Sequence, residues 1–332
     1  KQLKNYYNKM NEPIIYGIGN PLIDIIINAK DNDLNNLGLD KGVMHLVDEK
    51  RQKDILSYFS KLKPIYHPGG SAPNTLLACS ALGIPSLITG KIGNDKFGDV
   101  YIKQAQKFGV IPALVQGQGP TGSSIIIVTP DGERTMNTHL GMCRSFSKED
   151  IDIEKLSKSK FLYFTGYMWD TESQKTAIKT AIKTAKANKI KIIFDVADPF
   201  VVKRNREEFL EIIKKDIDIV FTNKSELAIL YDTKDYNISA NYLSKIVKIA
   251  GIKLGKKGSI VLENGMQTLL PPRSIIAKDS TGAGDMYAAG FISALSKGLE
   301  PIQAGKIGGF LAEEIIQEAG AQFNMNKIEE LR

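Results

Sequence analysis

A regular alternation of apolar, strand-like segments and amphipathic, helix-like segments constrains the fold of this chain more than any other feature. Strands are expected at 161–164, 190–195 and 217–222, and they alternate with helices expected at 172–188, 199–215 and 225–231. Parallel strands need long crossover connections, and helices in those connections cover both faces of the sheet. We therefore expect an α/β fold with a doubly wound, mostly parallel sheet sandwiched by helices.

Two β-biased segments do not fit this alternation. They cover about residues 24–47 and 117–138, and the second contains Asp131-Gly132 between two β-prone runs, a strong hairpin pattern. We expect the two segments to pair as a small sheet outside the main one, acting as a lid that excludes water from a ligand. The expected organisation is one domain over residues 13–332, with this lid as a sub-domain.

Composition and charge exclude several classes of protein. The 332 residues are 42% hydrophobic and 24% charged, as in ordinary globular proteins, and no apolar run reaches the roughly 18 residues of a membrane span. The polar segment 1–10 lacks the apolar region of a signal peptide, so we expect a cytoplasmic protein without a membrane partner. The net charge of +7 comes mostly from scattered lysines, which predicts no nucleic-acid partner. Two cysteines support neither a disulfide framework nor a zinc site.

The heptapeptide Asp279-Ser-Thr-Gly-Ala-Gly-Asp285 is the strongest functional motif. The turn formed by Gly282, Ala283 and Gly284, at the start of an expected helix, can direct backbone N–H groups at an anion. Asp285 would lie in the first helical turn, where it could take a proton from a hydroxyl group while a phosphoryl group is held nearby. The motif predicts a kinase, although alone it would fit close helix packing equally well.

Two further motifs are weaker. The loop Gly69-Gly70-Ser-Ala-Pro-Asn74 leads into an expected helix, and it could bring backbone and the Asn74 amide to vicinal hydroxyl groups. Asn223-Lys-Ser-Glu226 follows an apolar strand and could hold Mg²⁺ through water. Each also has a structural explanation, namely an ordinary helix start and a capping box. Arg134 in the hairpin could reach a phosphate, and Asp195 after its strand is a weak site candidate.

In this order, the three motifs resemble the ribokinase (PfkB-type) family of small-molecule kinases, over about residues 13–322. The resemblance implies ATP as donor and Mg²⁺, and is compatible with a monovalent-cation requirement. It also implies roles for particular residues: Asp285 as the catalytic base with Gly282, Ala283 and Gly284 as the anion hole, Gly69, Gly70 and Asn74 as binders of sugar hydroxyls, Asn223 and Glu226 at the Mg²⁺ site, and Asp279, Thr281 and Gly258 at the nucleotide.

Within that family, the segment Gly19-Asn-Pro-Leu22-Ile-Asp24 resembles the start of adenosine kinases. The resemblance implies that Asp24 grips ribose hydroxyls and Leu22 borders the base, that Tyr167 and Met168 lie in the region placing an aromatic against the purine, and that Arg134 contacts the substrate. It implies phosphorylation of a nucleoside, with adenosine converted to AMP, by a monomer or homodimer.

Other functions stay open at this stage. Residues 130–138, Pro-Asp-Gly-Glu-Arg-Thr-Met-Asn-Thr, look more like bacterial family members. A sugar kinase acting on ribose, fructose or 2-keto-3-deoxygluconate is therefore the alternative, followed by a non-catalytic nucleoside or sugar sensor on the same fold. A nicotinamide-dependent dehydrogenase is disfavoured, because the Gly-x-Gly-x-x-Gly match at 117–122 leads into a strand instead of a helix.

Overall fold

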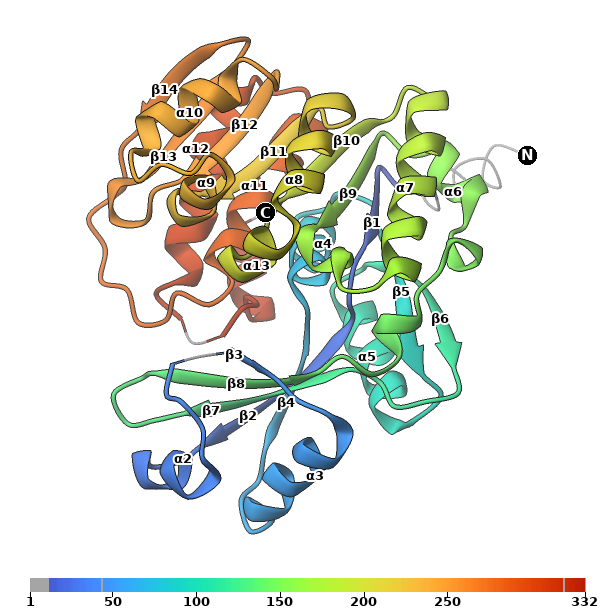
Figure 1. Ribbon diagram of the computed structural model, residues 1–332, viewed down its shortest axis with the longest axis vertical. Coiled ribbons are helices and arrows are strands. Elements are labelled where there is room, and N and C mark those ends of the chain that lie inside the picture. The colour runs from blue at the N-terminus through green and yellow to red at the C-terminus, as the bar shows by residue number, and fades with distance from the viewer. Residues whose placement is uncertain (1–11, 43, 319, 332) are drawn as a thin grey trace.

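The computed structural model describes residues 12–42, 44–318 and 320–331. Its larger sheet has nine strands in the order β14-β13-β12-β11-β10-β9-β1-β5-β6 (Figure 1). Neighbouring strands from β12 to β6 in this order run parallel, and β13 and β14 are antiparallel additions at one edge. The bounds are β1 Ile15–Ile18, β5 Ser86–Gly93, β6 Ile111–Gly117, β9 Phe161–Thr165, β10 Lys191–Asp195, β11 Ile219–Asn223, β12 Ile249–Lys253, β13 Ser259–Glu263 and β14 Met266–Leu270.

Alternating side chains of this sheet enter two separate hydrophobic cores. On β10, Ile193 packs in one core, and its neighbours Ile192 and Phe194 pack in the other. Successive strand side chains point to opposite faces, so both faces must be covered. One core includes helices α4 (Ser71–Ala81), α5 (Lys96–Lys107), α11 (Ala283–Ser296), α12 (Pro301–Ile315) and α13 (Met325–Leu331); the other includes α6 (Ile153–Ser157), α7 (Glu172–Ala187), α8 (Pro199–Lys215), α9 (Lys224–Leu230) and α10 (Tyr236–Ser244).

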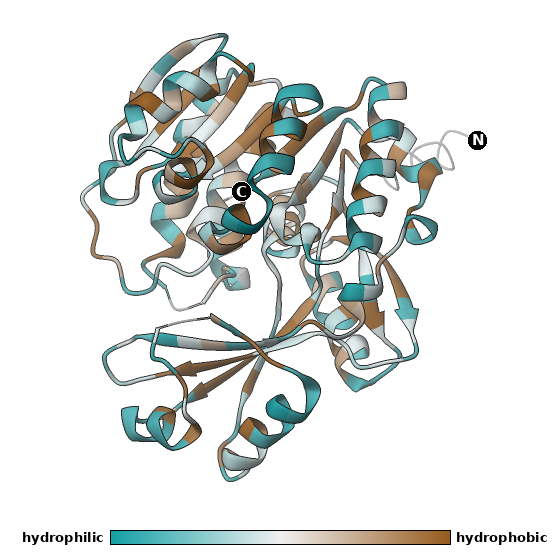
Figure 2. Cartoon of the chain, viewed as in Figure 1, coloured by the Kyte–Doolittle hydropathy of each residue, from teal (hydrophilic) through white to brown (hydrophobic). Residues whose placement is uncertain are grey.

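Apolar residues accordingly concentrate along the strands of the large sheet, while the outer faces of its helices are polar (Figure 2). The expected doubly wound α/β fold is confirmed. In the described part of the chain, no helix combines the length and the apolar character needed to cross a membrane.

A second, five-stranded sheet lies apart from the large one, in the order β3-β8-β7-β2-β4 (Figure 1). Its strands are β2 Leu22–Asn28, β3 Met44–Leu46, β4 Ile65–Gly69, β7 Ser123–Val128 and β8 Arg134–His139. The hairpin expected around Asp131-Gly132 joins β7 to β8, and β2 pairs in parallel with β7. Ile23, Ile25 and Ile27 share a core with helices α2 (Asp31–Leu37) and α3 (Glu49–Tyr58), so the opposite face of β2 is left for a ligand.

Several elements differ from the sequence-based expectation. Helix α2 lies inside the segment expected to be extended, and its end is defined by Gly38 in the left-handed conformation, with φ +60°. Strand β4 occupies an expected loop and forms an edge of the small sheet. Helix α10 and strand β12 were not expected. In β12, Gly251 lowers strand propensity, but a Cβ atom there would lie 2.6 Å from the Tyr287 ring, so close packing requires the glycine.

Candidate active site

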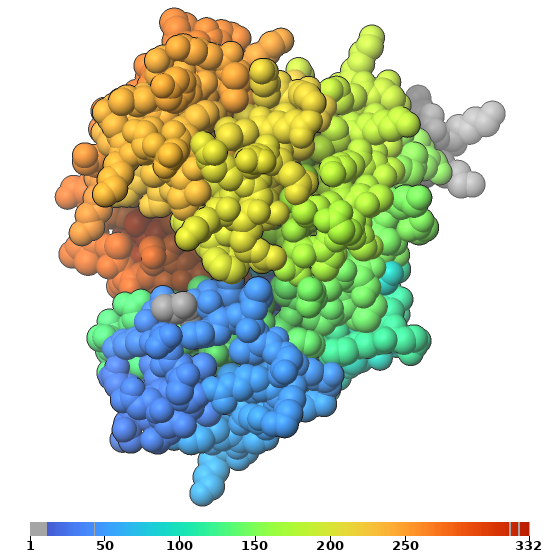
Figure 3. Space-filling view, in the orientation of Figure 1, coloured from blue at the N-terminus to red at the C-terminus, as the bar shows by residue number. Residues whose placement is uncertain are grey.

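Four neighbouring parallel strands end in polar residues at one edge of the large sheet. Thr165, Asp195, Asn223 and Lys253 are the last residues of β9, β10, β11 and β12. The register pairs Thr165 with Asp195 and Asn223 with Lys253. All four line a cavity of about 1570 Å³ whose wall also includes small-sheet residues, and Figure 3 shows the surface hollowed between these two parts. Ligands of open α/β sheets bind at this edge.

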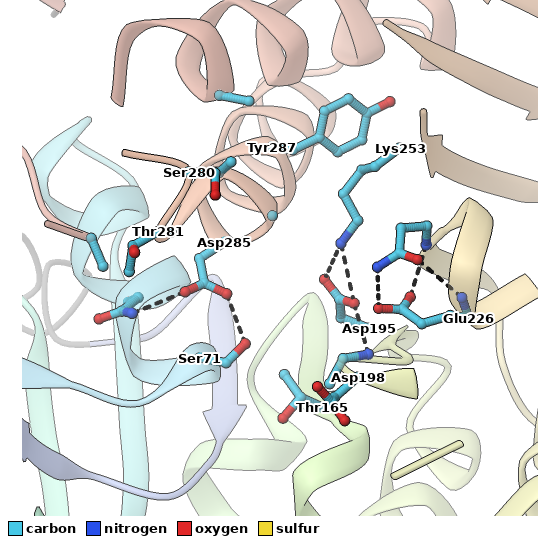
Figure 4. Close-up of a pocket in the computed structure, with 18 of the residues that line it drawn as sticks. Ser71, Thr165, Asp195, Asp198, Glu226, Lys253, Ser280, Thr281, Asp285 and Tyr287 are labelled. Atoms are coloured by element: carbon cyan, nitrogen blue, oxygen red, sulfur yellow. Dashed lines mark hydrogen bonds and ion pairs between the residues drawn. The ribbon is translucent and has the colours of Figure 1, made fainter. Parts of the chain in front are cut away.

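Asp285 lies in the first turn of α11, on the wall of the cavity. Its Oδ1 accepts a 2.7 Å hydrogen bond from the Ser71 hydroxyl, and its Oδ2 accepts a 2.9 Å bond from Asn74 Nδ2 (Figure 4). Burial raises the pKa of Asp285 to about 6, although the bonds from Asn74 and Ser71 act to lower it. A carboxylate with a pKa near neutrality is suited to accepting a proton from a bound hydroxyl group.

Gln322, which the motifs did not point to, supports this arrangement. Its Nε2 donates a 2.8 Å bond to Asn74 Oδ1. The Asn74 amide therefore has its oxygen engaged by Gln322, and its nitrogen is left to face Asp285.

The Gly-Ala-Gly turn immediately precedes this carboxylate. Gly282 is the N-cap of α11 with φ +74°, and a Cβ atom there would lie 2.7 Å from the Cα of Ala321. Only glycine fits both the backbone conformation and the space. Gly282, Ala283 and Gly284 all line the cavity, at a helix start where N–H groups lack acceptors within the helix. The turn can therefore bind the oxygen atoms of a phosphoryl group.

Asp24 lies across the cavity on the small sheet, next to the Gly69-Gly70 pair. A Cβ atom at Gly69 would lie 2.5 Å from the Asp24 carboxylate, and Gly70 has φ +97° with its backbone packed against the Asn20 carbonyl. The cavity wall includes Leu22, Asp24, Gly70 and Asn74, whereas Gly69 lies outside the described lining residues and instead makes room for Asp24. Burial raises the pKa of Asp24 to about 7, against the opposing effect of the Arg134 charge.

Asn223 and Glu226 form a complete capping box at the start of α9. The Asn223 side chain accepts from the N–H groups of Ser225 and Glu226, and Glu226 accepts from the Asn223 N–H at 2.8 Å. Burial raises the pKa of Glu226 to about 7. Both residues line the cavity. The described residues contain no cluster of three or more His, Cys, Asp or Glu suited to a metal.

Lys253 is a charged residue of the site that the sequence motifs missed. Its Nζ lies 3.1 Å from Asp195 Oδ2, and the two side chains are only 18% and 3% exposed (Figure 4). Burial alone would lower the pKa of Lys253, but the Asp195 and Glu226 carboxylates raise it above its ordinary value. The ammonium is therefore charged at neutral pH. A basic residue after an apolar strand is a recognisable signal, but Gly251 concealed that strand.

Comparison with known proteins identifies the family of this chain. The sequence pattern of the pfkB family carbohydrate kinases matches residues 49–328. The chain belongs to the pfkB family. It is similar to an adenosine kinase from Sinorhizobium meliloti at 32% identity, covering 96% of this chain and 99% of that chain with a TM-score of 0.87. A probable sugar kinase from Rhizobium etli CFN 42 is 30% identical, with 96% and 98% covered and a TM-score of 0.88.

A curated relative gives the same picture: adenosine kinase from Dictyostelium discoideum is 26% identical over 325 residues, covering 91% of this chain and 94% of that protein. The resemblance to PfkB-type kinases is thus confirmed. This pfkB kinase is a phosphotransferase with an alcohol group as acceptor, related to nucleoside and sugar kinases, and its family implies the use of ATP and typically Mg²⁺.

Arg134 does not point into the cavity of this pfkB kinase as a free phosphate ligand. Its Nη1 donates 2.6 Å bonds to Asp279 Oδ2 and Thr281 Oγ1, and Asp279 also accepts the Gly320 N–H at 2.9 Å. Thr281 and Gly258 line the cavity, whereas Arg134 and Asp279 lie outside its described lining. The Arg134–Asp279 pair therefore links β8 of the small sheet to the start of the heptapeptide 279–285.

The two residues expected near the purine, Tyr167 and Met168, lie in different surroundings after β9. Tyr167 lines the cavity, as expected, but Met168 is fully buried in the hydrophobic core and lies outside the described lining. The 3₁₀ turn Gly166–Trp169 rotates successive side chains, so adjacent residues face different surroundings. Phe200, which sequence reasoning missed, lines the cavity with 54% of its surface exposed. A large apolar side chain in the first turn of α8 was the available signal.

Proposed function

We propose that this pfkB kinase transfers the γ-phosphate of ATP to the 5′-hydroxyl of adenosine, producing AMP. The observation that carries this choice is the apolar inner face of the small sheet beside Asp24. The cavity wall there is mostly apolar, with Leu22, Met44, Leu46, Ile126, Met136 and Leu140, and its hydroxyl groups on Ser124 and Thr138 bond to each other at 2.9 Å. The base of a nucleoside matches such a wall, and its ribose matches the carboxylate of Asp24. A free sugar would instead place hydroxyl groups against apolar side chains, where they lose hydrogen bonds to water.

The polar residues of the cavity suit the ribose and the reacting hydroxyl. In our proposal Asp24, Gly70 and Asn74 hold the ribose, and Tyr167 and Phe200 provide aromatic surface for the base. Asp285 accepts the 5′-hydroxyl proton while the hydroxyl oxygen bonds to the γ-phosphorus and the bond from phosphorus to ADP breaks. The N–H groups of Gly282, Ala283 and Gly284 stabilise the charge that develops on the phosphoryl oxygens.

The phosphoryl donor would lie on the side of the cavity that is formed by the later part of the chain. We place ATP against Gly258 and Thr281, with Asp279 acting through its bonds to Thr281 and Arg134. Hydrated Mg²⁺, contacted through water by Asn223 and Glu226, would neutralise phosphate charge. The small sheet carries Asp24 and the apolar wall, so we propose that it is a lid of the single domain 13–332 and excludes water when it closes.

A panel of ATP-dependent assays tests the acceptor. Adenosine, inosine, ribose, fructose and 2-keto-3-deoxygluconate should be compared by kcat/KM, with formation of the phosphorylated product verified by mass spectrometry. We expect adenosine to be preferred. Preferred turnover of a sugar would instead establish the sugar-kinase alternative, which the similarity to a probable sugar kinase supports. Binding of adenosine without ADP production would indicate a sensor.

A further inference from the structure

Lys253 brings a buried positive charge to the backbone of the catalytic turn. A Cβ atom placed on Gly284 would lie 3.2 Å from Lys253 Nζ, so the ammonium approaches the second glycine of the turn. Gly284, Lys253 and Asp285 all line the cavity, and Figure 4 shows Lys253 extending from the β12 side toward the space beside Asp285. Because Gly284 has no side chain, the Lys253 ammonium can lie next to the proposed phosphoryl site.

Asp195 holds Lys253 in this position. Its carboxylate is 3.1 Å from Nζ and nearly completely buried, and its Oδ1 also accepts the Ala197 N–H at 3.1 Å. Ala197 has φ +82°, a conformation that is unfavourable for a residue other than glycine. Removing two charges from water is expensive, so a buried pair is weak evidence of a purely stabilising role.

The ammonium of Lys253 carries three N–H donors, and Asp195 is the acceptor described for it. An N–H group of Lys253 that faces the cavity can bind an anionic ligand while the ion pair with Asp195 remains in place. Asp195 and, to a lesser extent, the nearby Glu226 raise the pKa of the lysine.

We propose that Lys253 is a catalytic residue that binds the oxygens of the γ-phosphoryl group together with the N–H groups of the Gly282–Gly284 turn, and that Asp195 is its positioning residue. As the acceptor oxygen bonds to phosphorus, the bond from phosphorus to ADP breaks, and its electron pair stays on the ADP oxygen. The acceptor proton goes to Asp285. Lys253 remains protonated throughout and offsets the negative charge. The inference rests on the phosphotransferase activity of the family and does not depend on which acceptor is used.

Lys253→Met tests the contact. With the acceptor identified by the substrate panel, we expect kcat to fall at least about 100-fold, the order lost when one preorganised donor is removed. The acceptor KM should change little, because the contact is with phosphate. Lys257→Met is the matched control: Lys257 lies over the Tyr236 ring at 5.5 Å and outside the described cavity lining, so kcat should stay normal. Near-normal kcat for Lys253→Met would overturn the proposal.

Nucleotide binding provides a readout that needs no acceptor. Calorimetry with ADP and with β,γ-methylene-ATP should show that Lys253→Met weakens the triphosphate analogue by about tenfold, the loss of one hydrogen bond to a charged group, with little effect on ADP. Equal weakening of both ligands would mean a general structural effect and would also overturn the proposal. This result stands even if adenosine is not the acceptor.

A double variant separates catalysis from folding. Lys253→Met leaves Asp195 buried without its partner, which could destabilise the protein. Asp195→Asn/Lys253→Met removes both charges, so we expect its thermal unfolding to recover relative to the single variant while kcat stays low. Recovery of normal kcat in the double variant would show that the lysine only neutralises Asp195.

Discussion

Asn74 on α4 donates a 2.9 Å hydrogen bond to Oδ2 of Asp285 on α11, although 211 positions separate the two residues. Both helices pack in the same core on one face of the large sheet. This contact joins the two Gly-rich loops into one site, since Asn74 follows the Gly69-Gly70 pair and Asp285 follows the Gly282–Gly284 turn. The amide is held between Gln322 and the carboxylate, so Asn74 can orient the group that we assign as the base.

Asp285→Asn tests that assignment most directly. The amide keeps the shape of the side chain but cannot accept the proton, and a positioned base typically contributes about 10²- to 10⁴-fold. We expect kcat to fall at least about 100-fold, while calorimetric affinity for the acceptor stays close to normal. Near-normal turnover by a correctly folded variant would be inconsistent with Asp285 as the base.

Ser71→Ala should change the pH dependence of the reaction. Asp285 has a pKa of about 6 and must be ionised to accept a proton, so kcat/KM should decline as the pH falls below about 6. The Ser71 hydroxyl stabilises the ionised form, and its removal should move this decline to higher pH by about one unit, the effect of one hydrogen bond to a charged group. Rates between pH 5 and 8 measure the shift. Ser157→Ala, at a half-buried position on α6 outside the described cavity lining, is the control. A decline that stays at the same pH would refute the Ser71 contribution.

Gln322→Leu tests the support of Asn74. Without the bond to Asn74 Oδ1, the amide can rotate and present its oxygen to Asp285, so we expect kcat to fall by about 3- to 10-fold, as for one neutral hydrogen bond. The KM for ATP should not change. Gln317→Leu provides a control in the same region, because Gln317 bonds to the Glu313 carbonyl instead. Equal effects of the two variants would argue against a specific role for Gln322.

Arg134→Met should destabilise the link between the small sheet and the heptapeptide. The side chains of Arg134 and Asp279 are 13% and 14% exposed, and removal of the arginine leaves a mostly buried carboxylate without its cation. We expect a loss of about 3 kcal/mol in the free energy of unfolding, measured with urea. Arg134→Met/Asp279→Asn should recover part of that loss. A double variant as unstable as the single one would show that the ion pair is not the cause.

The large sheet could be predicted because its strands are apolar runs, and the segments between them have the periodic apolar pattern of amphipathic helices. Strand β12 was missed because Gly251 interrupts the run, and the requirement for that glycine comes from Tyr287 on a distant helix. The loss of β12 hid Lys253, since a lysine at a strand end stands out only when the strand is recognised. Likewise, the Asn223 and Glu226 pattern fits both a capping box and a metal-site neighbour, and the structure shows the capping box together with a place on the cavity wall.

The sequence by itself determined the doubly wound fold and the phosphoryl-transfer motif at 279–285. The periodic spacing of apolar residues depends on residues only a few positions apart, and so does the conformation of a glycine-rich helix start. Only the tertiary structure decided that Arg134 is held by Asp279, that Met168 faces the core instead of the cavity, and that Lys253 lies between Asp195 and Gly284. These outcomes depend on which strands end side by side and how their neighbours pack, contacts between residues far apart in the chain.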